Sequence, residues 1–128
     1  MSKNLGALKL KQLTEEFSVC TVKDYEQVNF NRPFVFIGVT DQENSLVCET
    51  AHVPDNTLER EDGWLAFRVQ GVLEFSLVGI LSKLSTVLAE EGIGIFAIST
   101  FQTDYSLTKT VDFEKALSAL KRAGYLVE

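Results

Sequence analysis

The sequence is poor in the residues from which most metal centres and nucleophilic sites are built. Its 128 residues include one histidine, His52, and two cysteines, Cys20 and Cys48, which stand far apart. These are too few ligands for a zinc site. Each cysteine lies in a short apolar segment, so we expect two buried, reduced thiols. We expect His52, near the end of a strand, to be a surface or structural residue.

Long apolar runs are absent. The longest, such as residues 34–39, are far shorter than the roughly 18–20 residues of a membrane-spanning helix. Residues 1–10 contain two lysines but lack the apolar core of about 7–15 residues that marks a signal peptide. We therefore expect a cytoplasmic protein with no membrane partner.

Positive charge is scarcer than negative charge. The chain has 12 Lys and Arg against 18 Asp and Glu, a net charge of −6. Residues 1–62 carry 11 acidic and 6 basic residues, whereas residues 63–128 carry 7 and 6. No basic stripe follows the chain, so neither nucleic acid nor an anionic membrane is an expected partner.

The first half of the chain has the pattern of β-strands. Short alternating or β-branched segments predict strands at residues 8–13, 17–22, 34–40 and 45–50, the last two forming a hairpin. No segment in this half has a convincing amphipathic helical pattern. Residues 54–63 are polar and acidic, and we interpret them as the boundary between the two halves.

The second half predicts the order β-α-β-β-α-β. Strands are expected at residues 64–70, 93–100, 103–109 and 125–127. Apolar residues at helical spacing predict a first helix that ends at Gly92 and a second that ends at Gly124. Those residues are Leu77, Ile80, Leu81, Leu84 and Leu88, and then Phe113, Ala116, Leu117 and Leu120. This order is typical of a ferredoxin-like α+β fold, with helices on one face of an antiparallel sheet.

The loop before the first helix, residues 71–75, has two interpretations. Its glycine would let the backbone approach a ligand, and the helix-start amides beyond it favour a carboxylate or phosphate. The alternative, which the residues alone favour, is an ordinary connection with Leu73 and Phe75 buried. Gly79, which we expect one turn inside the helix, indicates close packing against a strand or a partner.

A second polar cluster surrounds a predicted turn. Ser99, Thr100, Thr103 and Asp104 bring hydroxyls and a carboxylate together. Asp104 is unfavourable in a strand by propensity, so it either binds an ammonium group or completes the turn through backbone amides. Both remain open. A helix start that favours anions, opposite a carboxylate, would suit a free amino acid.

Catalysis is not expected. No Ser, Cys or carboxylate has the sequence context of an activated nucleophile. Residues 92–97 superficially match a dinucleotide-binding fingerprint, but they follow a helix and enter a strand, the reverse of a phosphate cradle. An acyl phosphate hydrolase on this scaffold would need an arginine before the first helix, and residues 71–76 contain none. We expect no catalytic residue and no cofactor.

Three segments of the second half carry a family resemblance. They are GVLEFSLVGIL (71–81), LAEEGI (88–93) and IFAISTFQTDY (95–105). Together they resemble the small bacterial ACT-domain proteins and are similar to the ligand-binding ACT modules of the animal cytosolic arginine sensor. The first half resembles, more loosely, the divergent ACT-like module that precedes the domain in such proteins. The chain departs from the family at the polar Ser106 and residues 108–110, so we expect a more polar outer face on that strand.

The resemblance implies two ferredoxin-like (βαββαβ) ACT-type subdomains: a divergent one at residues 1–62 and an ACT domain at residues 63–128. It implies a non-catalytic regulatory protein that binds an amino acid at an interface between ACT units, forms a homodimer and acts on a separate effector protein. A structural or protein-interaction module with a vestigial pocket is the alternative. Carried over by position, the ligand-binding residues are Val72, Leu73, Glu74, Gly79, Gly94, Ile95, Ser99, Thr100, Thr103 and Asp104, with Asp104 holding the ligand's amino group.

Overall fold

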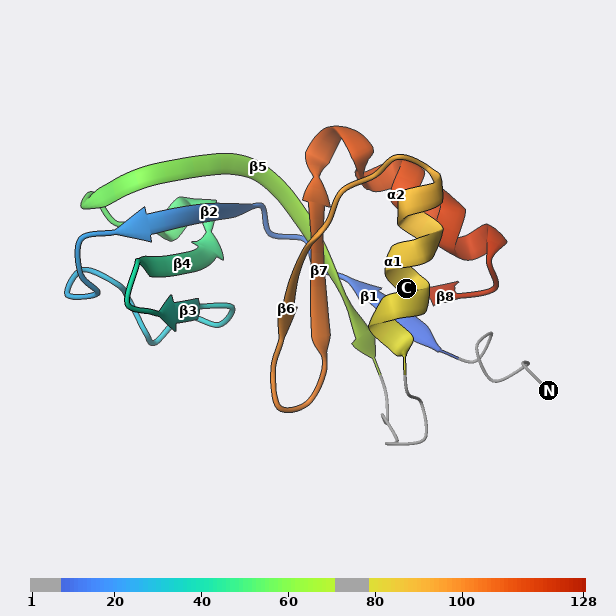
Figure 1. Ribbon diagram of the computed structural model, residues 1–128, viewed down its shortest axis with the longest axis horizontal. Helices are drawn as coiled ribbons and strands as arrows, with labels where there is room; N and C mark the ends of the chain where they lie inside the picture. The colour runs from blue at the N-terminus through green and yellow to red at the C-terminus, as the bar shows by residue number, and fades with distance from the viewer. Residues whose placement is uncertain (1–7, 71–78) are drawn as a thin grey trace. The chain divides into compact units, whose positions relative to one another are not determined.

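The computed structural model describes residues 8–70 and 79–128 (Figure 1). Its elements in chain order are β1 (Lys9–Gln12), β2 (Phe17–Val22), β3 (Phe36–Val39), β4 (Asn44–Glu49), the 3₁₀ helix η2 (Thr50–His52), β5 (Thr57–Gln70), α1 (Ile80–Glu90), β6 (Phe96–Ser99), β7 (Asp104–Lys109), α2 (Thr110–Arg122) and β8 (Leu126–Val127). The chain divides into two compact units. Unit 1 comprises residues 1–14 and 65–128, and unit 2 comprises residues 15–64.

Unit 1 has the predicted β-α-β-β-α-β order, from β5 through α1, β6, β7 and α2 to β8. Its strands lie in the order β8-β1-β5-β7-β6. The N-terminal strand β1 is inserted between the first and last strands of this repeat, antiparallel to β5 and parallel to β8. Apart from this insertion, the strand order is that of a ferredoxin-like sheet, so the α+β prediction is confirmed for this unit.

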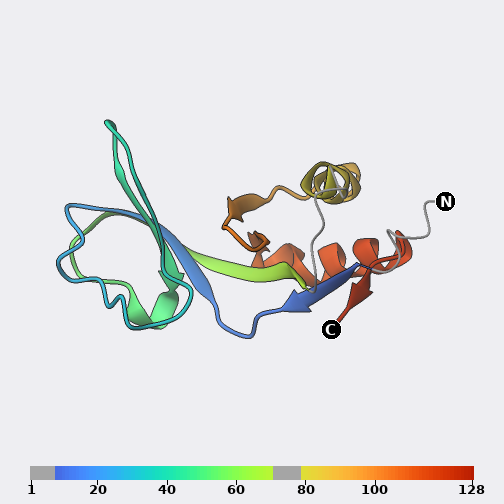
Figure 2. The same ribbon diagram turned by 90° about the horizontal axis from the view of Figure 1, so that it is seen from below.

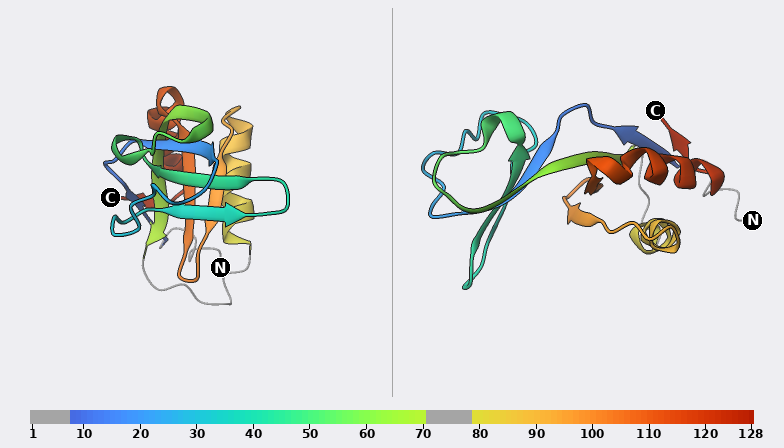
Figure 3. Two further views of the ribbon diagram at one scale, coloured as in Figure 1. Left: turned by 90° about the vertical axis from the view of Figure 1, so that its left-hand side faces the viewer. Right: turned by 90° about the horizontal axis from the view of Figure 1, so that it is seen from above.

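The two helices of unit 1 lie on the same side of its sheet. Figure 2 shows α1 and α2 on one side of β1 and β5, and the right-hand view of Figure 3 agrees. Their apolar faces pack on the strands and form the core, which comprises Leu8, Leu10, Phe67, Val69, Leu84, Leu88, Ile93, Phe113, Ala116, Leu117, Leu120 and Tyr125. The predicted apolar stripes of both helices therefore face the core wherever the structure describes them.

The ends of α1 depend on two glycines with left-handed backbone. Gly92 has φ +75°, and just beyond it the amide of Ile93 donates to the Leu88 carbonyl at 3.0 Å, so the predicted helix stop is confirmed. Gly79 has φ +82° and precedes the first described helical residue, Ile80. The prediction that Gly79 lies inside the helix was wrong. A Cβ at this position would meet nothing within 4 Å, so the backbone conformation rather than close packing favours glycine.

Unit 2 repeats the strand order of unit 1 but has no α-helices. If the strands of each repeat are numbered along the chain and the inserted β1 is left aside, both sheets have the order fourth, first, third, second. Its strands lie in the order β5-β2-β4-β3, and the left-hand view of Figure 3 shows β3 and β4 as a hairpin. Residues 15–64, all described, contain no α-helix: residues 23–35 are irregular and η2 is one short turn. Side chains of Tyr25, Val28 and Val35 from the irregular segment pack on the sheet residues Cys20, Val22, Leu46 and Cys48. The loop thus covers the face that helices cover in unit 1.

The boundary predicted at residues 54–63 is instead largely strand. Residues 57–64 of β5 pair with β2, with Thr57 opposite Val22 and Trp64 opposite Phe17. Their sequence is polar because an edge strand leaves many side chains in solvent. The division between the two units follows directly, between Trp64 and Leu65. The structure also assigns residues 1–14 to the C-terminal unit, since Lys9 pairs with Gln70.

Replacing Leu10 by alanine tests this assignment of β1. Leu10 is fully buried in the core of unit 1, so Leu10→Ala should lower the free energy of unfolding by about 2–5 kcal/mol. Urea denaturation followed by circular dichroism measures the loss. Val39→Ala, at a position 66% exposed, is the control and should cost about 0.5 kcal/mol or less. Equal, small losses in both variants would contradict the position of β1.

Candidate functional site

The polar cluster predicted between two strands forms the turn of the β6–β7 hairpin. Ser99 and Asp104 face each other across the hairpin, and the Ser99 hydroxyl donates to Asp104 Oδ1 at 2.6 Å. Between them, the Thr100 amide donates to the Thr103 carbonyl at 2.8 Å, and the Thr103 amide donates to Thr100 Oγ1 at 3.3 Å. These contacts close the turn through its own backbone and leave Asp104 Oδ2 with no hydrogen bond in the described part of the chain.

Thr103 ties the turn to the centre of the sheet. Its hydroxyl donates to the Val69 carbonyl of β5 at 2.7 Å. Because β5 pairs on either side with β1 and β7, the turn is anchored to the most enclosed strand of unit 1. Asp104 is therefore held in place by its own hairpin and by β5.

Asp104 lies on the side of the sheet that carries the helices. Phe67 and Val69 face the helical core, so Arg68 between them faces the other way. The Arg68 guanidinium carbon is 5.9 Å from the centroid of the Tyr105 ring, and Nη1 is 3.3 Å from its hydroxyl. Tyr105 therefore shares the face of Arg68, and the neighbouring Asp104 faces the helical side.

The start of α1 lies at the same end of unit 1 as this turn. Figure 1 shows the end of β5, the beginning of α1 and the β6–β7 turn together at the lower end of the unit. The N-cap of α1 is Gly79, which has no side chain to accept a hydrogen bond, and the first turn contains no acidic residue. Its first amides and the helix dipole favour an anion. This end of unit 1 thus combines a carboxylate with a helix start.

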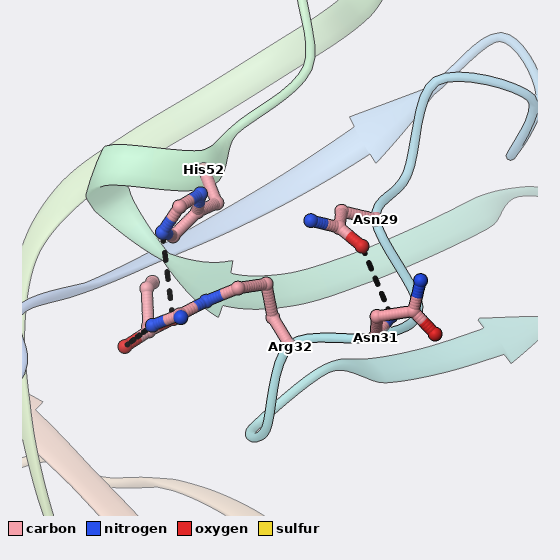
Figure 4. Close-up of polar contacts among 5 residues, drawn as sticks. Asn29, Asn31, Arg32 and His52 are labelled. Atoms are coloured by element: carbon pink, nitrogen blue, oxygen red, sulfur yellow. Dashed lines mark hydrogen bonds and ion pairs between the residues drawn. The ribbon is translucent and has the colours of Figure 1, made fainter.

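An ion pair that holds a buried carboxylate in unit 2 was not predicted. The Glu49 side chain is 7% exposed and accepts three hydrogen bonds from Arg32: from Nε at 3.1 Å, and from Nη2 at 2.9 and 3.2 Å. His52 Nε2 is 3.9 Å from the same carboxylate. Figure 4 shows Arg32 reaching out of the loop that contains Asn29 and Asn31, with His52 on the same side. The pair fastens this loop to the end of β4.

A second polar network joins η2 to β5. The fully buried Ser18 hydroxyl lies 2.8 Å from Thr50 Oγ1 and donates to Asp62 Oδ1 at 2.5 Å. Arg60 Nε donates to the same oxygen at 2.8 Å. The hydrogen bonds from Arg60 and Ser18 lower the pKa of Asp62 below its usual value. The network therefore holds a carboxylate in its charged form.

Both cysteines are buried and free, as predicted. Desolvation raises the pKa of Cys48 to about 11 and also raises the pKa of Cys20. Neither thiol is therefore an activated nucleophile at neutral pH.

No group of three or more His, Cys, Asp or Glu side chains could hold a metal ion within residues 8–70 and 79–128. Among the helices in those ranges, none is long and apolar enough to cross a membrane.

Comparison with known proteins identifies the family. The model of the ACT domain matches residues 59–122, half of the chain. The chain belongs to the ACT-domain family. The match begins in β5 and ends with α2, so it includes both helices of unit 1 and the β6–β7 turn. No curated protein sequence gave a match.

Solved structures with a similar fold cover most of the chain, beyond the residues that the ACT model matches. The protein Atu0741 from Agobacterium tumefaciens has 32% sequence identity and a TM-score of 0.84, with 94% of this chain and 92% of that chain covered. The Clostridium acetobutylicum aspartate kinase, described as an allosteric enzyme, has 21% identity and a TM-score of 0.64. The match covers 86% of this chain and 33% of the kinase chain. The regulatory subunit of the Thermus thermophilus aspartate kinase has 10% identity and a TM-score of 0.62, with 89% and 95% covered. The two kinases show the fold alone.

The structure unites four of the residues predicted to bind ligand in the ACT domain and separates two others. Ser99, Thr100, Thr103 and Asp104 form the β6–β7 turn described above. Gly94 and Ile95 precede β6, at the opposite end of that strand from the turn, and Ile95 packs on the core. Gly79 lies at the start of α1. Val72, Leu73 and Glu74 lie outside the described residues.

Ser106 and Thr108, two of the polar residues at which we noted a departure from the family resemblance, do not lie on an outer face. Ser106 and Thr108 are 2% and 0% exposed, and they alternate with Tyr105 so that they face the helices. The expected polar outer surface on this strand was wrong, because alternation along β7 turns these hydroxyls inward.

One signal in the sequence could have revealed the Arg32–Glu49 pair. Residues 46–48 of β4 are apolar and buried, and Glu49 continues that strand as a carboxylate. A buried carboxylate requires a cationic or hydrogen-bonding partner. A carboxylate at this position therefore predicts a partner for Glu49. The loop that supplies Arg32 has no local pattern that would identify Arg32 as that partner.

Removing the Arg32 guanidinium should destabilise unit 2. Losing one partner of a buried pair costs about 3–5 kcal/mol, but Arg32 is 40% exposed, and solvent screening reduces the expected loss for Arg32→Gln to about 1–3 kcal/mol. Adding Glu49→Gln should recover part of the loss because it removes the buried charge. Urea unfolding of the two single variants and the double variant measures the coupling.

The exposed pair of Arg122 and Glu91 is the matched control for this cycle. Its nitrogen–oxygen distance is 3.4 Å, and the side chains are 63% and 34% exposed. Arg122→Gln should cost at most about 0.5 kcal/mol. The same small loss at Arg32 would show that Glu49 does not depend on it.

The two thiols should be protected from alkylation in the folded protein. With a pKa of about 11, only about 0.1% of Cys48 is thiolate at pH 8, so iodoacetamide should label it slowly; the same reagent in urea should label both cysteines quickly. The raised pKa also predicts that stability declines as pH rises from about 9 towards 11, because only the unfolded thiol ionises there. Rapid labelling of the native protein would contradict the burial of these side chains.

Proposed function

We propose that this chain is a non-catalytic sensor whose ACT domain binds a free amino acid. The observation that carries the proposal is the carboxylate of Asp104, fixed by the β6–β7 turn on the same side and at the same end of unit 1 as the uncapped start of α1. A free amino acid presents an ammonium group and a carboxylate a short distance apart. Its two charges match these two features.

The amino group is assigned to Asp104. Asp104 Oδ1 accepts from Ser99, while Oδ2 takes part in no hydrogen bond of the described chain, so one oxygen remains for an ammonium donor. A charge-assisted hydrogen bond of this kind is about twice as strong as a neutral one. Thr103 keeps the carboxylate in position through the Val69 carbonyl.

The ligand carboxylate is assigned to the start of α1. Helix-start amides bind anions through their unpaired N–H groups and the helix dipole. Gly79, with its left-handed backbone, has no side chain of its own to cap this end, and no side-chain cap hydrogen bond is found among the described residues. Val72, Leu73 and Glu74 remain proposed as further contacts on the strength of the family resemblance, whereas Gly94 and Ile95 would contribute from the other end of β6.

The remaining parts of the proposal concern assembly. Unit 2 has the strand order of unit 1, and we take it as the divergent ACT-like subdomain, its helices replaced by residues 23–35 and η2. An interface between ACT units in a homodimer would enclose the ligand, and a separate effector protein would receive the signal. The turn of the β6–β7 hairpin, where Phe101 is fully exposed, is available for such contacts.

A thermal-shift screen against the twenty amino acids, with nucleotides as controls, tests the sensor. Ligand at 100 times its dissociation constant should stabilise the protein by about 2.7 kcal/mol. Asp104→Asn should abolish the shift, because it removes the charge and keeps an oxygen that can accept from Ser99. The protein is refolded beforehand to remove any bound ligand, and calorimetry confirms the affinity.

Glu114→Gln is the control for the loss of one negative charge. Glu114 is exposed on α2, so the ligand shift should persist in this variant. A flat screen of the refolded parent protein would reject the sensor in favour of a protein-interaction module with a vestigial pocket. A ligand-induced thermal shift that persists in Asp104→Asn would show that the ligand's amino group binds at another residue.

A further inference from the structure

The sheet of unit 2 has two edges, and charged side chains guard one of them. At that edge, residues 59–62 of β5 are all charged, in the order Glu-Arg-Glu-Asp. At the other edge, β3 has the sequence Phe-Ile-Gly-Val and carries no charge. Charged side chains, prolines and bulges are the usual protection of an edge strand against pairing with another chain. β3 is short, but its register with β4 is unbroken and it has neither charge nor proline.

The backbone of β3 directs the donors and acceptors of two residues outward. The Thr40 amide donates to the Glu43 carbonyl at 3.0 Å, which closes the hairpin between β3 and β4. Hydrogen-bonded pairs alternate with non-hydrogen-bonded pairs along an antiparallel ladder. Val39 and Ile37 therefore belong to pairs of the second kind, and their N–H and C=O groups point away from β4. β3 ends the strand order of the sheet (Figure 1), so no strand in the described part of the chain meets these groups.

The side chains of the same two residues lie beside the core of unit 2. Ile37 is directly opposite Leu46, which is fully buried in the core beneath the irregular loop, so both side chains share a face. Val39 follows Ile37 on that face. Ile37 and Val39 are nevertheless 48% and 66% exposed. We call these two residues the apolar edge; a strand added to β3 would cover both.

The turn that follows β3 is acidic. Asp41 and Glu43 are both exposed in this turn. Burial raises the pKa of the Tyr25 hydroxyl, and the nearby charge of Glu43 raises it further. The same hydroxyl donates to the Gly38 carbonyl in β3 at 3.4 Å. The charge of Glu43 therefore acts on groups that contact β3 itself.

Unit 2 as a whole is strongly acidic. It contains 11 acidic and 3 basic residues, a net charge of −8. Arg32 and Arg60 are already paired with acidic residues of the unit, and the third cation is the exposed Lys23. Opposite charges steer association, and like charges oppose it. The charge therefore favours a basic partner at β3 and disfavours the same unit of a second copy.

We propose that β3 is the docking site of the separate effector protein, which adds an extended basic segment to this edge of unit 2. Main-chain hydrogen bonds to Ile37 and Val39 give affinity, and apolar side chains at alternate positions of the segment cover the apolar edge. Lysine or arginine residues beside them face Asp41 and Glu43. The inference deepens the proposed function, on which it rests, and leaves the amino-acid site of unit 1 unchanged.

Fluorescence anisotropy of a labelled peptide, KKVTVTVKK, tests the docking site on the full chain. The peptide should bind saturably, and binding should weaken between about 50 and about 300 mM salt as screening increases. Val39→Lys should weaken binding by at least about tenfold, because it replaces an apolar side chain by a charge like that of the peptide. Val39→Pro should have the same effect, because proline has no N–H to donate to an added strand. The acidic peptide EEVTVTVEE should not bind.

Leu58→Lys is the matched control, because it makes the same change of charge at a position 70% exposed on the guarded edge. This variant should bind the basic peptide as the parent does, and circular dichroism confirms that each variant folds. Three results would each overturn the proposal: no saturable binding to the parent, equal losses in Leu58→Lys and Val39→Lys, or full binding by Val39→Pro. A parent dimer that Val39→Lys dissociates in analytical ultracentrifugation would also overturn it, since the occupant of β3 would then be a second copy.

The amino-acid screen is run on the parent and on Val39→Lys, which separates the two proposals. The ligand-induced thermal shift should be the same in both. A parent that binds the peptide at β3 but responds to no amino acid leaves the docking site standing and rejects the sensor. A parent that responds to an amino acid but does not bind the peptide rejects the docking site alone.

Discussion

The structure depends on β5, because this one strand is hydrogen-bonded in both units. Its first part, Thr57 to Trp64, is the edge strand of unit 2, paired with β2. Its last part lies between β1 and β7 in unit 1. An edge strand can carry charged side chains, whereas a central strand covered by helices must be apolar on that face. The change in composition at Trp64 therefore marks a change from edge to centre within one strand.

The parts of the fold that were predictable are those with a local signal. The helix-facing residues of α1 and α2 follow a period of 3.6, and β6 and β7 flank a turn with hydroxyl and carboxylate residues. The positions of β1 and of residues 57–62 were missed because they are set by pairing between distant segments. Lys9 meets Gln70, and Glu59 meets Thr21, and no local pattern contains that information.

The same distinction applies to the polar groups. The Ser99–Asp104 cluster is contiguous in sequence and was predicted as a unit. The Arg32–Glu49 pair spans 17 residues and an irregular loop. The sequence pattern therefore indicated a buried carboxylate at Glu49 but did not identify Arg32 as its partner. Lys11 lies opposite Arg68 across the β1–β5 ladder, a pairing that cannot be seen along the chain. Contacts between segments that are distant in the sequence bring these polar groups together, and composition does not reveal such contacts.

On the proposed function, the two units share a strand order but not a ligand chemistry. A helix start that attracts a carboxylate requires a helix, and α1 belongs to unit 1. In unit 2 the corresponding segment, residues 23–35, is irregular, and its arginine, Arg32, is already paired with the buried Glu49. A cation used to neutralise a buried carboxylate is not free to recognise a second one without exposing the first. On the proposed function, unit 1 therefore supplies the ligand-binding groups.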